Sequence, residues 1–442
     1  MSFIAEFNSL PVQTFLRRSL DAHADSVHKS LAKSKLSLTD FAHLISPAAS
    51  EFLETLARRS HQLTQQRFGK VIRLFAPLYL SNECVSNCQY CGFSRDNPIL
   101  RVTLSLDEVK QEADVLRERG FRNILLVAGE HPKFVSNNYL RDCIAALHFD
   151  WPGISLEVGP LETADYRPLV TAGADGLVVY QETYDRGVYA EMHTAGPKRN
   201  FDWRLETPER AYAAGFRRLG ISPLYGLADW RYEAICAAAH ADYLLRNCWK
   251  AALTISLPRL RPCAGEFQPL TRMSDRDLAQ LVCAFRILFP DVGLVLSTRE
   301  PAKLRDGLIP LGITLMSAGS HTEPGGYTGA GRDHLHQTVR GRIVPAATAS
   351  GEPAPLQRHA KATEQFAIAD TRSPQEVADL IRGLGYEPVW KDWDAALTPA
   401  EAGASEDGLG LGLGLGLRSG PSRNPNPNPN PNPNPNRNPP QI

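Results

Sequence analysis

Three cysteines that lie close together in the sequence are the residues best suited to carry out chemistry. Cys84, Cys88 and Cys91 form a C-x₃-C-x₂-C arrangement soon after an apolar, strand-like run at Val71–Leu80. A structural zinc site usually needs four ligands in two separated pairs, and no other Cys or His follows until His131. Three thiolates on one loop instead suit a 4Fe–4S cluster in which one iron has no protein ligand. The sequence therefore predicts an iron–sulfur cluster that a small molecule can coordinate.

Alternating strand and helix patterns follow Gly69 and predict the scaffold that holds this loop. Apolar β-rich runs predict strands at Val71–Leu80, Ile124–Ala128, Ile154–Val158, Gly176–Tyr180, Arg218–Ile221, Leu253–Leu257, Gly293–Leu296 and Ile313–Met316. Helical patterns separate most of them, as at Leu106–Arg119, Pro208–Ala214 and Asp275–Phe289. This order, over roughly 250 residues, predicts an α/β fold of the (β/α)₈ TIM-barrel type, with a doubly wound open sheet as the alternative. Active sites of such barrels lie at the carboxyl ends of the strands, which is where the cysteine loop falls.

The rest of the chain divides into segments of different composition. Residues 1–70 predict a helical N-terminal extension, with helix-compatible spacing at Val12–Ser30, Ser37–Ile45 and Ala48–Gly69. The barrel is expected at 71–329, and an insertion-like stretch with a short C-terminal α/β segment at 330–397. Residues 398–442 hold a Gly-Leu alternation and repeated Asn-Pro pairs. Because proline removes backbone donors and the segment has almost nothing to bury, we interpret it as a disordered tail.

Composition excludes several classes of function. The 442 residues are 43% hydrophobic, and 48 Lys and Arg balance 48 Asp and Glu, so there is no charge excess for nucleic acid or an anionic membrane. No apolar run approaches the ~18 residues of a membrane span, and the N-terminus lacks a signal-peptide pattern. Clustered cysteines in a chain of this length are typical of metal-binding thiols in a reducing compartment. We therefore predict a cytoplasmic protein with neither nucleic acid nor membrane as a partner.

The cysteine spacing, with Tyr90 before the third cysteine, resembles that of the radical S-adenosylmethionine (SAM) enzymes. In that superfamily the amino and carboxylate groups of SAM chelate the open iron, and electron transfer from the cluster gives a 5′-deoxyadenosyl radical. The resemblance implies a radical SAM barrel with one 4Fe–4S cluster per chain and SAM as cofactor. It also implies that Gly129 and Glu130, after the second strand, bind SAM. Glu157, at the end of the third strand, and Arg204 are further candidates for SAM contacts, although the acids flanking Arg204 permit a simple salt bridge.

A longer likeness indicates one family within the superfamily. The segment Leu78–Ser94 resembles the aromatic amino acid lyases, and most closely the 2-iminoacetate synthase family. Further stretches that resemble this family are Val179–Tyr184, Trp203–Pro208, Ser256–Pro262, Ser297–Glu300, Pro324–Tyr327 and Pro388–Trp393. The likeness extends from about Leu10 to Leu397 and is poor at Ala330–Lys361.

The resemblance implies a reaction and its partners. The family cleaves the Cα–Cβ bond of L-tyrosine to p-cresol and 2-iminoacetate (dehydroglycine), which a thiazole synthase subunit uses for the thiazole ring of thiamine. A low-potential reductant such as flavodoxin is the expected electron donor. A related hydrogenase maturase is disfavoured because it carries C-terminal cysteines for a second cluster, whereas no cysteine follows Cys283 here. A tryptophan-cleaving radical SAM lyase and a non-catalytic iron–sulfur scaffold on the same barrel remain the alternatives.

Candidate substrate contacts follow from chemistry and resemblance together. A fixed amino-acid carboxylate needs a bidentate cation, which is the geometry of arginine. Arg299, after the seventh strand, aligns with the carboxylate-binding arginine of the family; a surface ion pair is the alternative. Ser317, after the eighth strand, is a candidate hydroxyl contact. Tyr79 matches an aromatic residue near the reacting amino group, with ordinary barrel packing as its alternative. Cys263 is expected to line the site without a catalytic role.

Overall fold

Eight parallel strands form a closed barrel in the structure, a computed structural model that describes residues 2–339, 342–344 and 360–390. The strands are β1 (Val71–Ser81), β3 (Asn123–Ala128), β4 (Gly153–Glu157), β5 (Gly176–Glu182), β7 (Arg218–Pro223), β8 (Ala252–Ser256), β9 (Gly293–Leu296) and β10 (Leu315–Ser317). Each pairs in parallel with its neighbour, and β10 pairs with β1 through Arg73 and Leu315, which closes the barrel. The predicted (β/α)₈ barrel is confirmed, and the open sheet is wrong.

Helices surround the barrel and connect its strands. They are α6 (Leu106–Glu118), α7 (Asn137–Leu147), α8 (Thr163–Thr171), α9 (Arg186–Met192), α10 (Phe201–Leu205), α11 (Thr207–Ala214), α12 (Trp230–Asn247), α13 (Asp275–Leu288) and α14 (Ala302–Leu308), with the 3₁₀ turns η2 (Pro197–Arg199), η3 (Ile309–Leu311) and η4 (Arg332–His334). Capping boxes start α6 at Ser105 and α13 at Ser274, where the N-cap hydroxyl and an acid three residues later satisfy free backbone donors. Local sequence therefore fixes where these helices begin.

Strand β1 shows how the barrel separates its core from its interior. Successive side chains of a strand point to opposite faces. Leu78 and Leu80 are fully buried in the apolar layer between strands and helices, whereas Phe75 and Tyr79 line cavities inside the barrel. The alternation therefore places Tyr79 inside the barrel, near the carboxyl end of the strand.

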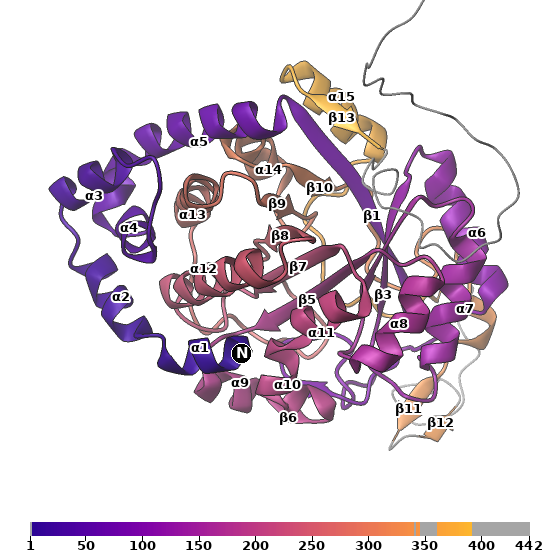
Figure 1. Ribbon diagram of the computed structural model, residues 1–442. Helices are drawn as coiled ribbons and strands as arrows, with labels where there is room; N and C mark the ends of the chain where they lie inside the picture. The colour runs from indigo at the N-terminus through magenta and orange to yellow at the C-terminus, as the bar shows by residue number, and fades with distance from the viewer. Residues whose placement is uncertain (1, 340–341, 345–359, 391–442) are drawn as a thin grey trace, which may run out of the picture. The chain divides into compact units, whose positions relative to one another are not determined.

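The N-terminal helices pack on the outside of the barrel helices. They are α1 (Phe3–Ser9), α2 (Val12–Leu20), α3 (Ala24–Leu31), α4 (Leu38–Leu44), the turn η1 (Ala48–Phe52) and α5 (Leu53–Phe68). Figure 1 shows α2 to α5 as an indigo arc outside α12 and α13. The continuous helix predicted at Val12–Ser30 is two helices, because the chain turns between α2 and α3 so that both contact α4. The ring of Phe3 stacks on His240 of α12 at 4.2 Å, which anchors the extension to the barrel.

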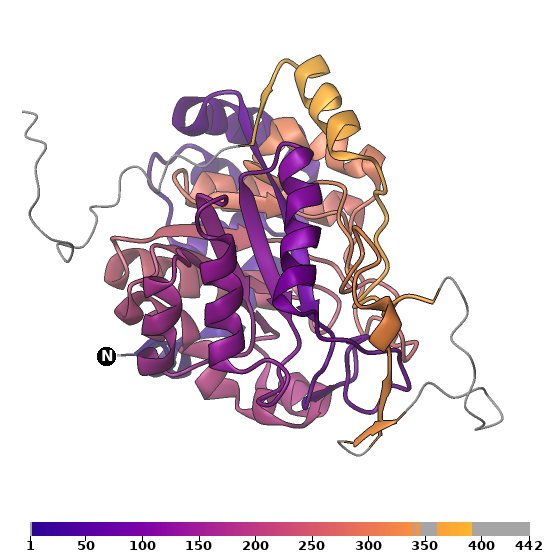
Figure 2. The same ribbon diagram turned by 90° about the vertical axis from the view of Figure 1, so that its right-hand side faces the viewer.

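The C-terminal part adds elements at both ends of the barrel. Helix α15 (Pro374–Gly383) leads to β13 (Glu387–Val389), which pairs with the first residues of β1, and β11 (Gln337–Val339) and β12 (Arg342–Val344) form a hairpin. Figure 2 shows α15 at one end of the molecule and the hairpin at the other. The division of the chain into four segments stays a prediction, and the tail at 398–442 lies outside the described residues.

Candidate active site

The three predicted cluster ligands lie together at the carboxyl end of β1. A short antiparallel pair of β2 (Asn87–Cys88) and β6 (His193–Ala195) holds the middle of the loop, with Cys88 opposite His193. The Val85 N–H donates to the Glu130 carbonyl oxygen at 2.8 Å, which ties the loop to the end of β3. Burial, together with the nearby Cys91 thiol, raises the pKa of the Cys84 thiol to about 11.

This donor set fits a 4Fe–4S cluster. Burial also raises the pKa of the Cys88 thiol, and the Cys91 and Cys84 thiols raise it further, so the three sulfurs lie close enough to affect one another. Among the described residues, no group of three or more His, Cys, Asp or Glu side chains has the arrangement needed to bind a single metal ion. A cluster differs from a single ion in that each thiolate binds a different iron, and coordination takes the place of the thiol proton. Three close, unpaired thiols in largely apolar surroundings therefore suit a cluster better than one ion.

Gly129 and Glu130 pack directly against the cluster loop. A Cβ atom at Gly129 would lie 2.2 Å from the Glu83 carbonyl oxygen, so only glycine allows β3 to approach the loop this closely. The Glu130 carboxylate accepts a hydrogen bond from the Ser86 hydroxyl at 3.2 Å. The structure thus places both predicted SAM-binding residues beside Cys84, and the contact with SAM stays a prediction.

Arg204 belongs to a buried charge cluster beside the loop. Its Nη2 atom lies 3.3 Å from Oε1 of Glu182, and Lys198 Nζ lies 2.6 Å from the same oxygen. These two cations hold the pKa of the Glu182 carboxyl below its ordinary value despite burial. Arg204 therefore pairs with Glu182 rather than with the acids that flank it in sequence, and one of those, Asp202, pairs with Arg186.

The predicted substrate residues line one pocket inside the barrel mouth. Tyr79 on β1, Glu157 on β4, Arg299 after β9 and Ser317 on β10 all border it, with Tyr180, Ser256, Ser297, Ser320, Thr322 and Phe366 among the other lining residues. Glu157, predicted as a cofactor contact, lies in this pocket with Arg299. The barrel thus brings together side chains from four strand ends, as its geometry requires.

Existing contacts orient three of these side chains. The Arg299 guanidinium stacks on the Phe366 ring, with 3.3 Å between Cζ and the ring centroid. The Ser317 hydroxyl accepts a hydrogen bond from the Thr298 N–H at 3.1 Å, which fixes the turn that carries Arg299. The Tyr79 hydroxyl donates to Gln365 Oε1 at 2.8 Å. All three are held in place by neighbours that the sequence did not single out.

A chain segment across the barrel mouth supplies part of the site that sequence reasoning missed. The Thr363 N–H donates to the Leu100 carbonyl oxygen, the Ala367 N–H to Pro262 and the Ala369 N–H to Thr298, at 2.8–3.0 Å. We call residues 361–370 the strap. Its Gln365 and Phe366 contact Tyr79 and Arg299, although no motif near them indicated a role.

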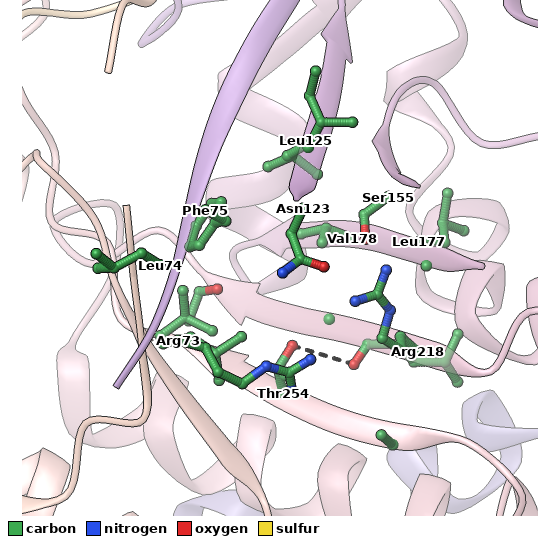
Figure 3. Close-up of a pocket in the computed structure, with 18 of the residues that line it drawn as sticks. Arg73, Leu74, Phe75, Asn123, Leu125, Ser155, Leu177, Val178, Arg218 and Thr254 are labelled. Atoms are coloured by element: carbon green, nitrogen blue, oxygen red, sulfur yellow. Dashed lines mark hydrogen bonds between the residues drawn. The ribbon is translucent and has the colours of Figure 1, made fainter. Parts of the chain in front are cut away.

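A second cavity lies inside the barrel at the opposite end of the strands. Figure 3 shows Arg73, Asn123 and Arg218 on its walls, and Arg218 forms an ion pair with Asp175. The Asn123 side-chain Nδ2 donates to the Trp390 carbonyl oxygen at 3.4 Å, which connects this end to the residue after β13. These three side chains come from the N-terminal halves of their strands, whereas active sites of such barrels lie at the carboxyl ends. The cavity meets the substrate pocket in the middle of the barrel, where both are lined by Phe75, Leu125, Tyr180, Ser256 and Val295.

Glu157 is a carboxyl group in the pocket whose pKa is raised strongly. Burial raises its pKa to about 7, although the nearby Arg299 opposes the shift. Glu182 also raises this pKa, whereas Arg204 and Lys198 lower it. Its solvent-accessible part faces the pocket. Glu157 therefore changes charge close to neutral pH in the protein without ligands.

We expect Glu157→Gln to remove a pH dependence of stability. The folded pKa of about 7 lies above the ordinary 4.5, so the folded protein keeps a proton that the unfolded chain loses between these values. The free energy of unfolding of the wild type therefore falls as pH rises from 4.5 to 7, by up to about 3 kcal/mol. The free energy of unfolding of the variant should equal that of the wild type at pH 4.5 and exceed it at pH 8. Urea denaturation without SAM or tyrosine measures this, with exposed Glu118→Gln as control; parallel wild-type and variant profiles would contradict it.

The closed barrel and the three-cysteine loop at its mouth define a radical SAM enzyme. The Radical SAM superfamily model matches residues 78–238, and the Biotin and Thiamin Synthesis associated domain matches residues 256–387. The chain is 42% identical to the 2-iminoacetate synthase of Escherichia coli strain K12 and 40% identical to that of Salmonella typhimurium strain LT2. Each alignment covers 85% of this chain and 92% of the relative. The chain belongs to the 2-iminoacetate synthase family.

The chain is also similar to a solved structure of a hydrogenase maturase. The maturase HydG of the FeFe-hydrogenase from Carboxydothermus hydrogenoformans has a TM-score of 0.75 and 34% sequence identity, and the match covers 87% of this chain and 85% of that one. The predicted family, enzyme class, function and cofactors, a 4Fe–4S cluster and SAM, are confirmed by these relationships. Among the described residues, no helix has both the length and the apolar character needed to cross a membrane.

Proposed function

We propose that the chain cleaves the Cα–Cβ bond of L-tyrosine, releasing p-cresol and 2-iminoacetate, and that the pocket beside the cysteine loop holds the substrate. One observation carries the proposal: Arg299 lies in the same pocket as Tyr79, Glu157 and Ser317, at the end of the barrel that bears the three thiols. A non-catalytic cluster scaffold would not need an arginine in this pocket. The family relationship supplies the reaction.

We propose a division of roles among the pocket residues. The planar Arg299 guanidinium, stacked on Phe366, holds the substrate carboxylate in two places. Tyr79 and Ser317 lie near the amino end of the substrate. Gly129, Glu130 and Arg204 contact SAM, and Glu157 contacts it from the border of the substrate pocket. When bound, the cluster and SAM supply the radical that takes a hydrogen atom from the substrate. The strap, with the Phe366 side chain in the wall, shields this reaction from water.

We propose two protein partners and a compartment on chemical grounds. 2-Iminoacetate is an imine that water hydrolyses, so direct transfer to a thiazole synthase subunit protects it. A 4Fe–4S cluster that must reduce SAM needs a low-potential electron donor, such as flavodoxin. The free cysteines of the described residues suit the reducing cytoplasm.

Product analysis tests the proposed function. Reconstituted protein is incubated without oxygen with SAM, dithionite and either L-tyrosine or L-tryptophan. We expect p-cresol and 5′-deoxyadenosine to accumulate together with tyrosine. Turnover of tryptophan but not tyrosine would identify the tryptophan-cleaving alternative. A protein that binds four irons but releases no 5′-deoxyadenosine would be the non-catalytic scaffold.

A further inference from the structure

Gln365 of the strap connects the cluster loop to the substrate pocket. Its backbone N–H donates to the Thr322 carbonyl oxygen at 2.9 Å, and its own carbonyl oxygen accepts from the Gly92 N–H at 3.0 Å. Its side-chain Oε1 accepts from the Tyr79 hydroxyl at 2.8 Å, and its Nε2 lies 3.9 Å from Sγ of Cys91, within the reach of a long N–H···S hydrogen bond. One residue thus contacts both a predicted cluster ligand and a predicted substrate residue.

The surroundings fix the direction of this amide. A thiolate sulfur only accepts hydrogen bonds, so the NH₂ group of Gln365 faces Cys91 and the carbonyl oxygen faces the Tyr79 hydroxyl. A Cβ atom at Gly92 would lie 2.5 Å from the Gln365 carbonyl oxygen, so the strap and the cluster loop are in direct backbone contact. The backbone therefore holds the amide at Cys91 independently of the side chain's own bonds.

We propose that Gln365 is a positioning residue that raises the reduction potential of the cluster through an N–H···S hydrogen bond to Cys91. This inference rests on the proposed role of the three cysteines as cluster ligands. Reduction adds a negative charge that the ligand sulfurs share, and hydrogen bonds to those sulfurs favour the reduced state. The bond from Tyr79 polarises the amide and strengthens its N–H donor. Buried Tyr79 and Phe93 border this part of the loop and exclude water, which strengthens the interaction further.

A redox titration of the reconstituted full-length protein, followed by electron paramagnetic resonance, tests this role without turnover. Gln365→Leu keeps a similar volume but removes the donor. At the wild-type midpoint potential, we expect the ratio of reduced to oxidised cluster in Gln365→Leu to be about tenfold lower than in the wild type. This corresponds to a midpoint potential lower by about 59 mV for one electron. Gln365→Glu keeps an acceptor for Tyr79 and places a carboxylate at the sulfur, so its potential should also fall. Gln375→Leu, at an exposed position on α15, is the matched control and should leave the midpoint unchanged.

Each other result counts against the inference. Midpoints equal to wild type in cluster-loaded Gln365→Leu and Gln365→Glu would overturn it. Failure of both variants to bind iron would also overturn it, because a tuning contact leaves the three thiolate ligands intact. A wild-type protein that binds no cluster, or that binds one and releases no 5′-deoxyadenosine, would instead refute the proposed function. The iron content and SAM cleavage of the wild type therefore distinguish the two failures.

Discussion

Replacing Cys84, Cys88 and Cys91 together by alanine is expected to abolish cluster binding and p-cresol formation while leaving the barrel folded. No other thiol belongs to this loop, and thiolate ligation has no substitute there. The loop lies at the rim, beyond β1, and the apolar layer that holds the barrel together is formed by side chains such as Leu78 and Leu80. We therefore expect iron binding to be lost completely and the folded structure to change little.

Iron analysis and circular dichroism measure the two effects separately. We expect four irons per chain in the reconstituted wild type, almost none in the triple variant, and similar far-ultraviolet spectra. Cys263→Ala is the matched control, because this thiol lies beside the loop and its Sγ donates to the Tyr90 carbonyl oxygen at 3.3 Å. It should keep its iron. Stable binding of four irons by the triple variant would show that other residues hold the cluster.

The barrel and its metal loop were predictable because their signals are local. Each strand is a short apolar run, and β9 begins and ends at the predicted residues Gly293 and Leu296. The boundaries of the other strands agree with the predictions or differ by at most two residues, since the ends of parallel strands have no side-chain signal of their own. Three cysteines close together in the sequence likewise predict a cluster without any knowledge of tertiary structure.

The contacts that orient the site were not predictable, because they join residues far apart in the chain. Gln365 reaches Tyr79 across 286 positions, and nothing in the composition of the strap distinguishes it from a surface loop. Arg204 offered two neighbouring acids as partners, yet the fold supplies Glu182 from the end of β5. Glu182 adopts a left-handed backbone with φ of 72°, which redirects the chain after the strand. A sequence identifies such residues as capable of pairing, but only the fold selects the pair.

Arg299→Lys is expected to slow p-cresol formation by about 100-fold while leaving cluster content and SAM binding unchanged. Lysine keeps the positive charge but loses the planar fork that holds a carboxylate in two places, and it loses the flat stacking surface on Phe366. A misplacement of about 1 Å at the reacting carbon can cost ~100-fold in rate. The radical still forms when tyrosine is bound in the wrong position, so the variant should release more 5′-deoxyadenosine than p-cresol.

Chromatography of both products, under the same anaerobic reduction, gives the rate and the coupling ratio together. Arg246→Lys is the matched control, because Arg246 is an exposed arginine that pairs with Glu6 at 2.6 Å on the outside of α12. It should retain wild-type rate and coupling. If Arg299→Lys also retains both, the substrate carboxylate binds elsewhere, and stacking on Phe366 becomes a structural contact in the pocket wall. If instead p-cresol and 5′-deoxyadenosine fall in parallel, Arg299 acts before radical formation, on SAM or the cluster, and its assignment to tyrosine is wrong.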